Sequence, residues 1–297
     1  MTSVVAVLGT GIMAAPTALN LAHAGFQVRA WNRTADKARV RLSAEVEVCA
    51  EPSHPVAGAD AVVTTMLSDG AAVESVMRDG KAPSAMEDSA RWLQTSAIGI
   101  AATERCSKAA AERGVAFVDA PVLGTKQPAE AGELSVMASG PDECRATAQP
   151  YFDAIGSKTL WLGEAGAGSR LKLVVNNWLL ALVGGLAETV ALAESVGVLP
   201  QQFLDVIDGG PLGPAYAQLQ GKAMIQRSFE AAFPLVHARK DPALVIEAAE
   251  ANGLEPRVAK AVRDQFDISI DAGHGDEDMA AAYYASTSGR DTTKGAG

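Results

Sequence analysis

The sequence predicts an α/β fold: a doubly wound, mostly parallel sheet in the first half, then one long helix and an all-α carboxy-terminal domain. Three observations predict it. Short apolar runs alternate with helical stretches through about the first 160 residues. A proline-free helical pattern then extends from residue 169 to residue 196. Beyond Pro200 the segments have helical periodicity, and a length of 297 residues agrees with about two domains.

The first strand is expected at Val4–Leu8, a run of five apolar residues of which three are valine. Gly9 ends this run, and a helix is expected from Pro16 to Ala24. Strands separated by helices need crossover connections, so the sheet is expected to be mostly parallel. Right-handed crossovers make such a sheet doubly wound. Further strands are expected at residues 27–31, 61–66, 89–93, 115–119, 134–138 and 159–162.

The long helix has one apolar stripe at helical spacing, formed by Leu171, Val175, Trp178, Leu182, Leu186 and Val190. Gly184 and Gly185, near its middle, either bend the helix or allow another helix to approach closely. We expect an α/β domain at residues 1–163, a helical domain at residues 164–285 and a disordered tail at residues 286–297. Further helices are expected at residues 200–208, 215–226, 238–251 and 256–271.

The composition argues against several function classes. The chain has 35 acidic and 25 basic residues, a formal net charge of −10, which argues against a general nucleic-acid or anionic-membrane partner. Residues 1–28 lack the basic start of a secretory signal, and Leu173–Ala187 is shorter than the roughly 20 residues of a membrane span. The three cysteines show neither disulfide nor zinc spacing. We therefore expect a cytoplasmic protein that uses no metal.

A glycine-rich loop follows the first strand and precedes the first helix. It reads Gly9-Thr10-Gly11-Ile12-Met13-Ala14 and fits the GxGxxG/A pattern of dinucleotide-binding Rossmann domains. Gly9 would allow the tight turn, and Gly11 would let the backbone approach a pyrophosphate. The helix N-terminus offers free N–H groups to that anion. A glycine turn without function is the alternative.

The end of the second strand indicates which dinucleotide is bound. NAD sites have Asp or Glu about 20 residues after the loop, whereas this chain has Asn32-Arg33-Thr34. Residues 29–41 contain five cations, including Lys37, against one acid. A guanidinium pairs well with a phosphate, so we expect NADP as the cofactor. The alternative is a solvated basic helix face, which suits Arg39 and Arg41 better than Arg33.

Lys172 and Asn176 lie four residues apart in the long helix and therefore share one face. A lysine among Leu171, Leu173 and Val174 would lose hydration, which lowers its pKa toward catalytic use. Asn176 can donate to and accept from a substrate oxygen. A surface lysine near a helix start is the alternative, although helix N-termini disfavour cations.

Five motifs of this sequence resemble those of the β-hydroxyacid dehydrogenase family and occur in the same order as in that family. The family includes 3-hydroxyisobutyrate and tartronate semialdehyde dehydrogenases. The resemblance covers about residues 4–285. It rests on Val7–Met13 with Pro16 and Asn20-Leu21, on Asn32-Arg33-Thr34, on Asp119-Ala120-Pro121-Val122 through Gly132, on Gly166-x-Gly168-x-x-x-Lys172-x-x-x-Asn176-Asn177, and on Lys240-Asp241.

The resemblance implies a Rossmann domain, a long interdomain helix, and a helical domain that forms a homodimer or homotetramer. It implies Lys172 as general acid/base and Asn176 as the residue that orients the substrate. Ser96 matches a serine on the nicotinamide side. The family's loop beside the cofactor matches Met66-Leu67-Ser68, and Lys240 lies in a motif near the nicotinamide.

The substrate loop departs from the family pattern. Leu123 stands where a serine is usual, and Thr125 stands where glycine is usual. We expect the backbone N–H groups of Gly124 and Thr125, with the Thr125 hydroxyl, to hold a substrate carboxylate instead. Ala97 follows Ser96 where the family has a second hydroxyl, so this site is one hydroxyl short.

We therefore expect an NADP-dependent oxidoreductase that interconverts a small 3-hydroxy acid and its semialdehyde or keto form. One alternative is an imine reductase or a broad carbonyl reductase of the same fold. The other is a non-catalytic NADP-binding module. Lys172 favours the hydroxy acid oxidoreductase over the imine reductase, because imine reductases commonly have Asp or Tyr at that position. The sequence leaves the substrate and the physiological direction open.

Overall fold

The computed structural model describes residues 3–64, 66–77, 82–87 and 89–287. The chain divides into two compact units, Met1–Leu173 and Val174–Gly297, and the division falls inside helix α8 (Ala167–Ser195). Most of the tail expected at residues 286–297 lies outside the described residues, which end at Thr287.

The first unit is built on a six-stranded parallel sheet in the order β3-β2-β1-β4-β5-β6. This order confirms the predicted doubly wound fold. The prediction missed the edge strand β3, whose four residues include the exposed Glu47. The strands are β1 (Val4–Leu8), β2 (Gln27–Trp31), β3 (Val46–Cys49), β4 (Ala61–Thr64), β5 (Arg91–Gln94) and β6 (Ala116–Asp119).

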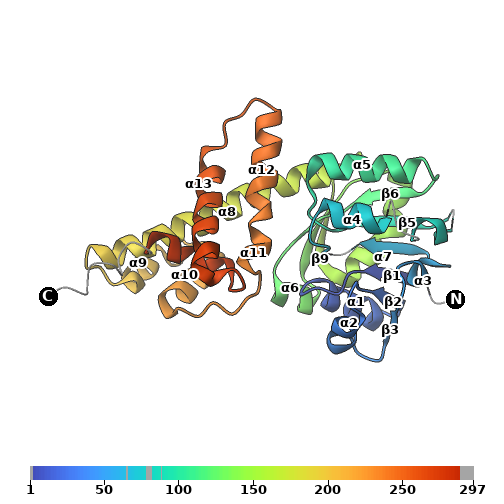
Figure 1. Ribbon diagram of the computed structural model, residues 1–297, viewed down its shortest axis with the longest axis horizontal. Coiled ribbons are helices and arrows are strands. Elements are labelled where there is room, and N and C mark those ends of the chain that lie inside the picture. Colours follow the sequence, from blue (N-terminus) through green and yellow to red (C-terminus); the bar gives the residue numbers. More distant parts are fainter. Residues whose placement is uncertain (1–2, 65, 78–81, 88, 288–297) are drawn as a thin grey trace. The chain divides into compact units, whose positions relative to one another are not determined.

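Helices cover both faces of this sheet (Figure 1). Side chains alternate along β1, so Val5 and Val7 lie in one buried core and Ala6 and Leu8 lie in another. The first core contains residues of α1 (Ala14–His23), α2 (Ala35–Arg41) and α7 (Arg145–Ile155). The second contains residues of α3 (Ser53–Val56), α4 (Gly70–Met77) and α5 (Gly99–Ala111).

Three strands form a separate, smaller sheet in the order β7-β8-β9, with bounds Val122–Leu123, Leu134–Ala138 and Gly156–Trp161. The prediction of a single sheet was therefore wrong for residues 134–138 and 159–162. The short helix α6 (Lys126–Ala131) returns the chain antiparallel to β7, so β8 pairs with β7 and not with β6. A single antiparallel bridge between Asp119 and Ser139 links the two sheets.

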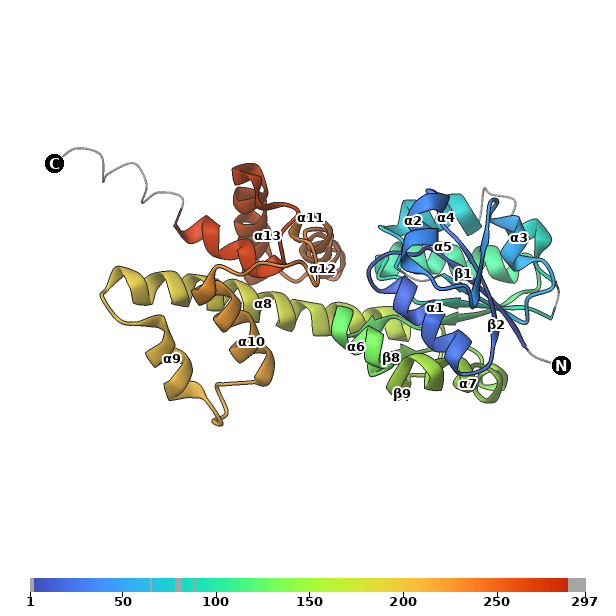
Figure 2. The ribbon, with the colours of Figure 1, turned by 90° about the horizontal axis from the view of Figure 1, so that it is seen from below.

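The second unit is helical, and its described residues 174–287 contain no strand. Helices α9 and α10 pack side by side, as do α12 and α13 (Figures 1 and 2). The elements after α8 are α9 (Pro200–Ile207), α10 (Ala215–Gln226), α11 (Leu235–Ala238), α12 (Lys240–Ala251), α13 (Arg257–Ser269), the π-helical turn η3 (Ile270–His274) and the 3₁₀ helix η4 (Met279–Ser286).

Close helix contact at Gly184 fixes α8 against α13. A Cβ at Gly184 would lie 2.7 Å from Val262 Cγ2 and 2.7 Å from Gln265 Oε1, whereas a Cβ at Gly185 would meet no described residue within 4 Å. Of the two expectations for this glycine pair, the close approach of another helix is therefore confirmed at Gly184.

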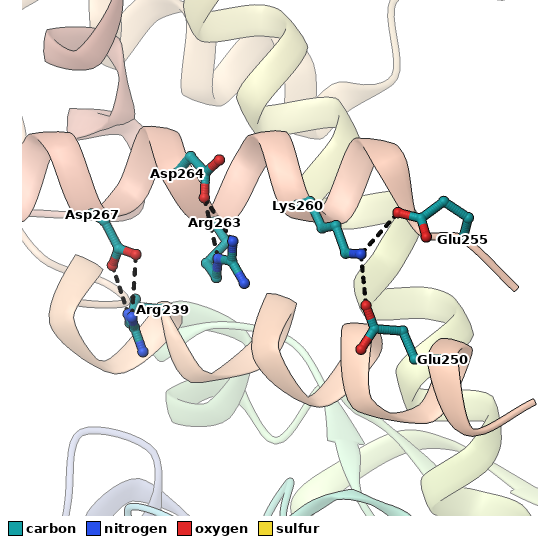
Figure 3. Close-up of polar contacts among 7 residues, drawn as sticks. All are labelled: Arg239, Glu250, Glu255, Lys260, Arg263, Asp264 and Asp267. Atoms are coloured by element: carbon teal, nitrogen blue, oxygen red, sulfur yellow. Dashed lines mark hydrogen bonds and ion pairs between the residues drawn. The ribbon is translucent and has the colours of Figure 1, made fainter.

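Ion pairs connect α12, α13 and the residues beside them (Figure 3). Arg239 donates to both carboxylate oxygens of Asp267 at 2.6 and 3.2 Å. Lys260 contacts Glu250 at 2.6 Å and Glu255 at 2.8 Å. These side chains are partly exposed to solvent, so each pair contributes little to the free energy of unfolding.

By length and composition, α8 is the one described helix that could cross a membrane, with a mean hydropathy of 1.5. The most apolar 18-residue stretch of α8 is 44% buried inside the protein, and a core helix of a soluble protein can be equally long and apolar.

Candidate active site

The loop between β1 and α1 has the geometry of a phosphate-binding turn. Gly9 has φ = 110°, which favours glycine, and its N–H donates to the Trp31 carbonyl at 2.7 Å. Among the described residues, a Cβ at Gly11 would meet only the Met66 carbonyl, at 3.7 Å, so the backbone there is open to a ligand. Ile12 and Met13 continue the loop, and Ala14 begins the helix. The residues present therefore fit a bound pyrophosphate.

Thr10 is a binding candidate that the sequence analysis missed. Its side chain is buried, and within the described residues its Oγ1 has no hydrogen-bond partner. A buried hydroxyl without a partner is costly, and a ligand oxygen would satisfy it. The Thr10 carbonyl accepts a hydrogen bond from Arg41 Nη1 at 3.0 Å. The solvated basic face was the alternative that suited Arg41, and Arg41 is indeed exposed, but its guanidinium also contacts this loop.

The five cations of residues 29–41 fall into two groups. Arg29 donates to the Ala57 carbonyl at 2.8 Å and lies near Glu47, and Arg39 pairs with Asp36 at 3.1 Å. Arg41 is engaged with the loop. Arg33 and Lys37 are exposed and make no ion pair within the described part of the chain. They are the cations free to meet a phosphate.

Asn32 and Thr34 organise the turn that presents Arg33. Asn32 Nδ2 donates to the Thr34 carbonyl at 3.0 Å, which closes a local turn. Thr34 is the residue that precedes α2, and its hydroxyl makes no hydrogen bond to the helix. This hydroxyl and the neighbouring guanidinium are therefore available to the same ligand.

Ser96 holds the Met66-Leu67-Ser68 loop. Ser96 is fully buried, its Oγ accepts from the Leu67 N–H at 3.3 Å, and its carbonyl accepts from Gln94 Nε2 at 3.2 Å. Met66 has φ = 39°, a left-handed conformation that is uncommon for a side chain of this size. The geometry makes Ser96 a support for this loop, in which only Ser68 is exposed.

The expected substrate loop lies between β7 and α6. Gly124 has φ = 143°, and a Cβ there would lie 2.5 Å from Leu134 Cδ2 and 3.2 Å from Pro128 Cβ, so only glycine fits. Thr125 precedes α6, and its hydroxyl makes no capping hydrogen bond. Leu123, Gly124 and Thr125 are all half-buried, within reach of a small ligand.

Lys172 and Asn176 lie one turn apart on α8. Lys172 is half-buried. Asn176 is 1% exposed, and neither of its amide atoms has a hydrogen-bond partner among the described residues. A buried amide without partners is rare in a folded protein and needs an explanation such as a missing ligand.

Lys240 begins α12, where its Nζ pairs with Asp241 Oδ1 at 2.6 Å. Asp241 is buried, so the pair fixes the direction of the lysine stem. Its expected place near the nicotinamide stays a prediction.

Comparison with known proteins assigns the family. Residues 4–163 match the NAD-binding domain of 6-phosphogluconate dehydrogenase, and residues 166–285 match the NAD-binding domain of NADP-dependent 3-hydroxyisobutyrate dehydrogenase. Glyoxylate/succinic semialdehyde reductase 1 of Arabidopsis thaliana is 30% identical over 279 residues, which cover 94% of this chain and 96% of that protein. The chain belongs to the β-hydroxyacid dehydrogenase family.

Solved structures of this family have the same fold. The 3-hydroxyisobutyrate dehydrogenase of Mycobacterium tuberculosis, in a structure with L-serine, is 27% identical with a TM-score of 0.82, and the match covers 96% of this chain and 99% of that one. The Salmonella typhimurium 3-hydroxyisobutyrate dehydrogenase is 23% identical with a TM-score of 0.84, over 95% of this chain and 99% of that one. The predicted Rossmann domain with a helical second domain is confirmed. As a family member, the protein is a nicotinamide-dependent oxidoreductase of the hydroxy acid and semialdehyde type.

Proposed function

We propose that the protein interconverts a small 3-hydroxy acid and its semialdehyde or keto form, with NADP as cofactor and Lys172 as general acid/base. The observation that carries this proposal is the buried Asn176 amide, which has no partner among the described residues and lies one turn from Lys172. A substrate oxygen would satisfy the amide and would come within reach of the lysine on the same helix face.

Bound NADPH would supply a hydride to the carbonyl carbon. As the carbonyl oxygen gains charge, the Lys172 ammonium gives it a proton and becomes a neutral amine. In the reverse direction the neutral amine accepts the hydroxyl proton. General acid/base catalysis of this kind contributes about 10²–10⁴-fold in rate. Asn176 would fix the reacting oxygen, which supplies part of the proximity effect.

The preference for NADP rests on three groups in the first unit. Arg33 and Lys37 carry charges that no described acid neutralises, and the Thr34 hydroxyl lies between them in sequence. A 2′-phosphate is the part of NADP that these groups would recognise and that NAD lacks. The proposed cofactor contacts also include Gly9, Gly11, Met66, Leu67 and Lys240.

The substrate class rests on the Gly124–Thr125 loop and on the relatives. The N–H groups of Gly124 and Thr125 and the Thr125 hydroxyl are three donors that suit a carboxylate. They would take over the role of the serine that is usual where Leu123 stands. The relatives include reductases named for glyoxylate and succinic semialdehyde, both small acids with an aldehyde group. Leu123 adds apolar surface beside this site, which would accommodate a short hydrocarbon chain.

The test is the steady-state rate of NADP⁺ reduction with a panel of small 3-hydroxy acids, and of NADPH oxidation with glyoxylate, succinic semialdehyde and a cyclic imine. We expect turnover with at least one 3-hydroxy acid and none with the imine. Lys172→Met should lower kcat by about 10²–10⁴-fold while NADPH binding, measured by fluorescence titration, stays nearly unchanged. Lys108→Ala, an exposed lysine on α5, is the matched control.

Full activity of Lys172→Met would remove the lysine from the mechanism. Turnover of the imine alone would favour an imine reductase. NADPH binding without turnover of any substrate would favour the non-catalytic module.

We also propose that the protein is a cytoplasmic homodimer or homotetramer assembled through its helical domain. In support, the three cysteines are buried and form no disulfide in the described structure, as suits a reducing compartment. Val174 and Trp178 on α8 are each 67% exposed, which suits burial against a second copy. Light scattering at several protein concentrations tests the assembly.

A further inference from the structure

A buried polar network lies at the start of α8. It contains Asp119 at the end of β6, Ser139 after β8, Ser169 in the first turn of α8, and Thr103 on α5. All four side chains are at most 4% exposed. The hydrogen-bond partners of the Asp119 carboxyl are hydroxyls and backbone N–H groups, and none that the described structure shows is a cation. An ionised carboxylate in such a place would be buried without a counter-charge, which is costly.

Three oxygen–oxygen contacts run in a row through this network. Asp119 Oδ1 lies 2.7 Å from Ser169 Oγ, Ser169 Oγ lies 3.0 Å from Thr103 Oγ1, and Thr103 Oγ1 lies 2.7 Å from the Gly99 carbonyl. Each contact needs one proton, but the two hydroxyls supply only two. If Asp119 is ionised, one of the three contacts has two oxygens and no proton between them.

A proton on Asp119 Oδ1 completes the row. Asp119 then donates to Ser169, Ser169 donates to Thr103, and Thr103 donates to the Gly99 carbonyl. The other oxygen, Oδ2, stays an acceptor for the Ser169 N–H at 2.7 Å and for the Ser139 hydroxyl at 3.3 Å. Burial independently raises the pKa of Asp119.

The network holds the first turn of α8 against both sheets. Gly168 N–H donates to Ser139 Oγ at 2.9 Å, and a Cβ at Gly168 would lie 2.2 Å from the Met137 carbonyl. The helix therefore cannot slide at this point without clashing with β8 or breaking hydrogen bonds to Asp119. Ser169 lies three residues before Lys172 and seven before Asn176, so all three share one helix face.

We propose that Asp119 is a positioning residue that acts as a neutral acid: it fixes the first turn of α8 and thereby the place of Lys172 one turn later. The link to Lys172 rests on the proposed function, whereas the neutral state of Asp119 does not. Asparagine is close in shape to a protonated aspartate, and its amide can donate to Ser169 Oγ while its oxygen accepts from the Ser169 N–H.

The test compares Asp119→Asn with Asp119→Ala. Asp119→Asn should keep kcat within about tenfold of the parent, because it preserves the direction of every hydrogen bond in the row. Asp119→Ala should lower kcat by about 10²-fold, the effect of a displacement of about 1 Å in a catalytic group, with little change in the Kd of NADPH. Equal losses of kcat in both variants, with both folded, would overturn the neutral-acid assignment.

A second measurement needs no variant to be active. The infrared difference spectrum of the parent minus Asp119→Asn at pH 7 should contain the carbonyl stretch of a protonated carboxyl group. Its absence would overturn the assignment. Unchanged kcat in Asp119→Ala would overturn the positioning role. If Lys172→Met keeps full activity, the proposed function fails, and the infrared band still decides the state of Asp119.

Discussion

Gly184 and Gly185 are adjacent glycines of one helix that should respond oppositely to the same substitution. In Gly184→Ala, the new methyl would lie 2.7 Å from Val262 Cγ2 and from Gln265 Oε1. Val262 is buried, so it cannot turn away, and overpacking of this kind costs about 1–3 kcal/mol. In Gly185→Ala, the methyl meets no atom of the described part of the chain within 4 Å, so only the gain in helix propensity remains, up to about 1 kcal/mol.

Both substitutions share the propensity gain, which therefore cancels in their difference. We expect Gly184→Ala to be less stable than Gly185→Ala by about 1–3 kcal/mol, with Gly185→Ala at or slightly above the parent. Urea unfolding followed by circular dichroism measures this difference. Equal stability of the two variants would show that α13 does not approach α8 at Gly184, and the packing argument would be wrong.

The remaining predictions concern cofactor binding, the substrate loop and acid stability. Arg33→Asp should weaken NADPH binding by about 10–100-fold and leave NADH binding nearly unchanged, because it removes a charge-assisted contact of about 1.5–3 kcal/mol; equal weakening in a fluorescence titration would refute the phosphate assignment. Arg41→Leu should weaken both cofactors alike, by about 5–10-fold, because it frees the Thr10 carbonyl and loosens the loop that both share; a loss confined to NADPH would instead place Arg41 on the phosphate. Gly124→Ala should raise KM for the acid substrate while the Kd of NADPH is kept, because its methyl would meet the buried Leu134; an unchanged KM would remove this loop from the substrate site. The Val4 N–H and the Ser3 hydroxyl lower the pKa of Asp60, so its ionised form stabilises the fold above about pH 4 and this contribution is lost as the pH falls through the lowered value. Asp60→Asn should therefore cost less than about 1 kcal/mol at pH 7 and nothing at the lowest pH, as urea unfolding at both pH values would show.

Much of the fold follows from local patterns that the sequence displays directly. Val4–Leu8 and Gln27–Trp31 have the predicted bounds. The first is an apolar run with three valines beside a glycine turn, which is a strong strand signal. The helix predicted at residues 215–226 also has the observed bounds. The strand Val46–Cys49 was missed because it has only four residues, lies at the sheet edge and contains the exposed Glu47.

Local sequence patterns could not predict which strands and side chains pair over long distances in the sequence. Residues 134–138 were correctly predicted as a strand, but one of their two partners is the two-residue strand Val122–Leu123, which is too short to recognise; the other is Gly156–Trp161. The same limit applies to the site. The glycine loop and the helix with Lys172 can be recognised from the spacing of their residues in the sequence. The contact of Arg41 with Thr10 cannot, because it joins residues 31 positions apart. The Asp119–Ser169 contact spans 50 positions and depends on how the two sheets meet.

The arginines and the lysine of residues 29–41 differ in how freely evolution can replace them. Arg29, Arg39 and Arg41 are each engaged with a protein group, so their loss disturbs local structure whatever coenzyme is used. Arg33 and Lys37 are exposed and form no described ion pair, so their replacement costs the fold little. Under the proposed assignment, a descendant of this protein could therefore switch coenzyme through two surface substitutions without any compensating change in its interior.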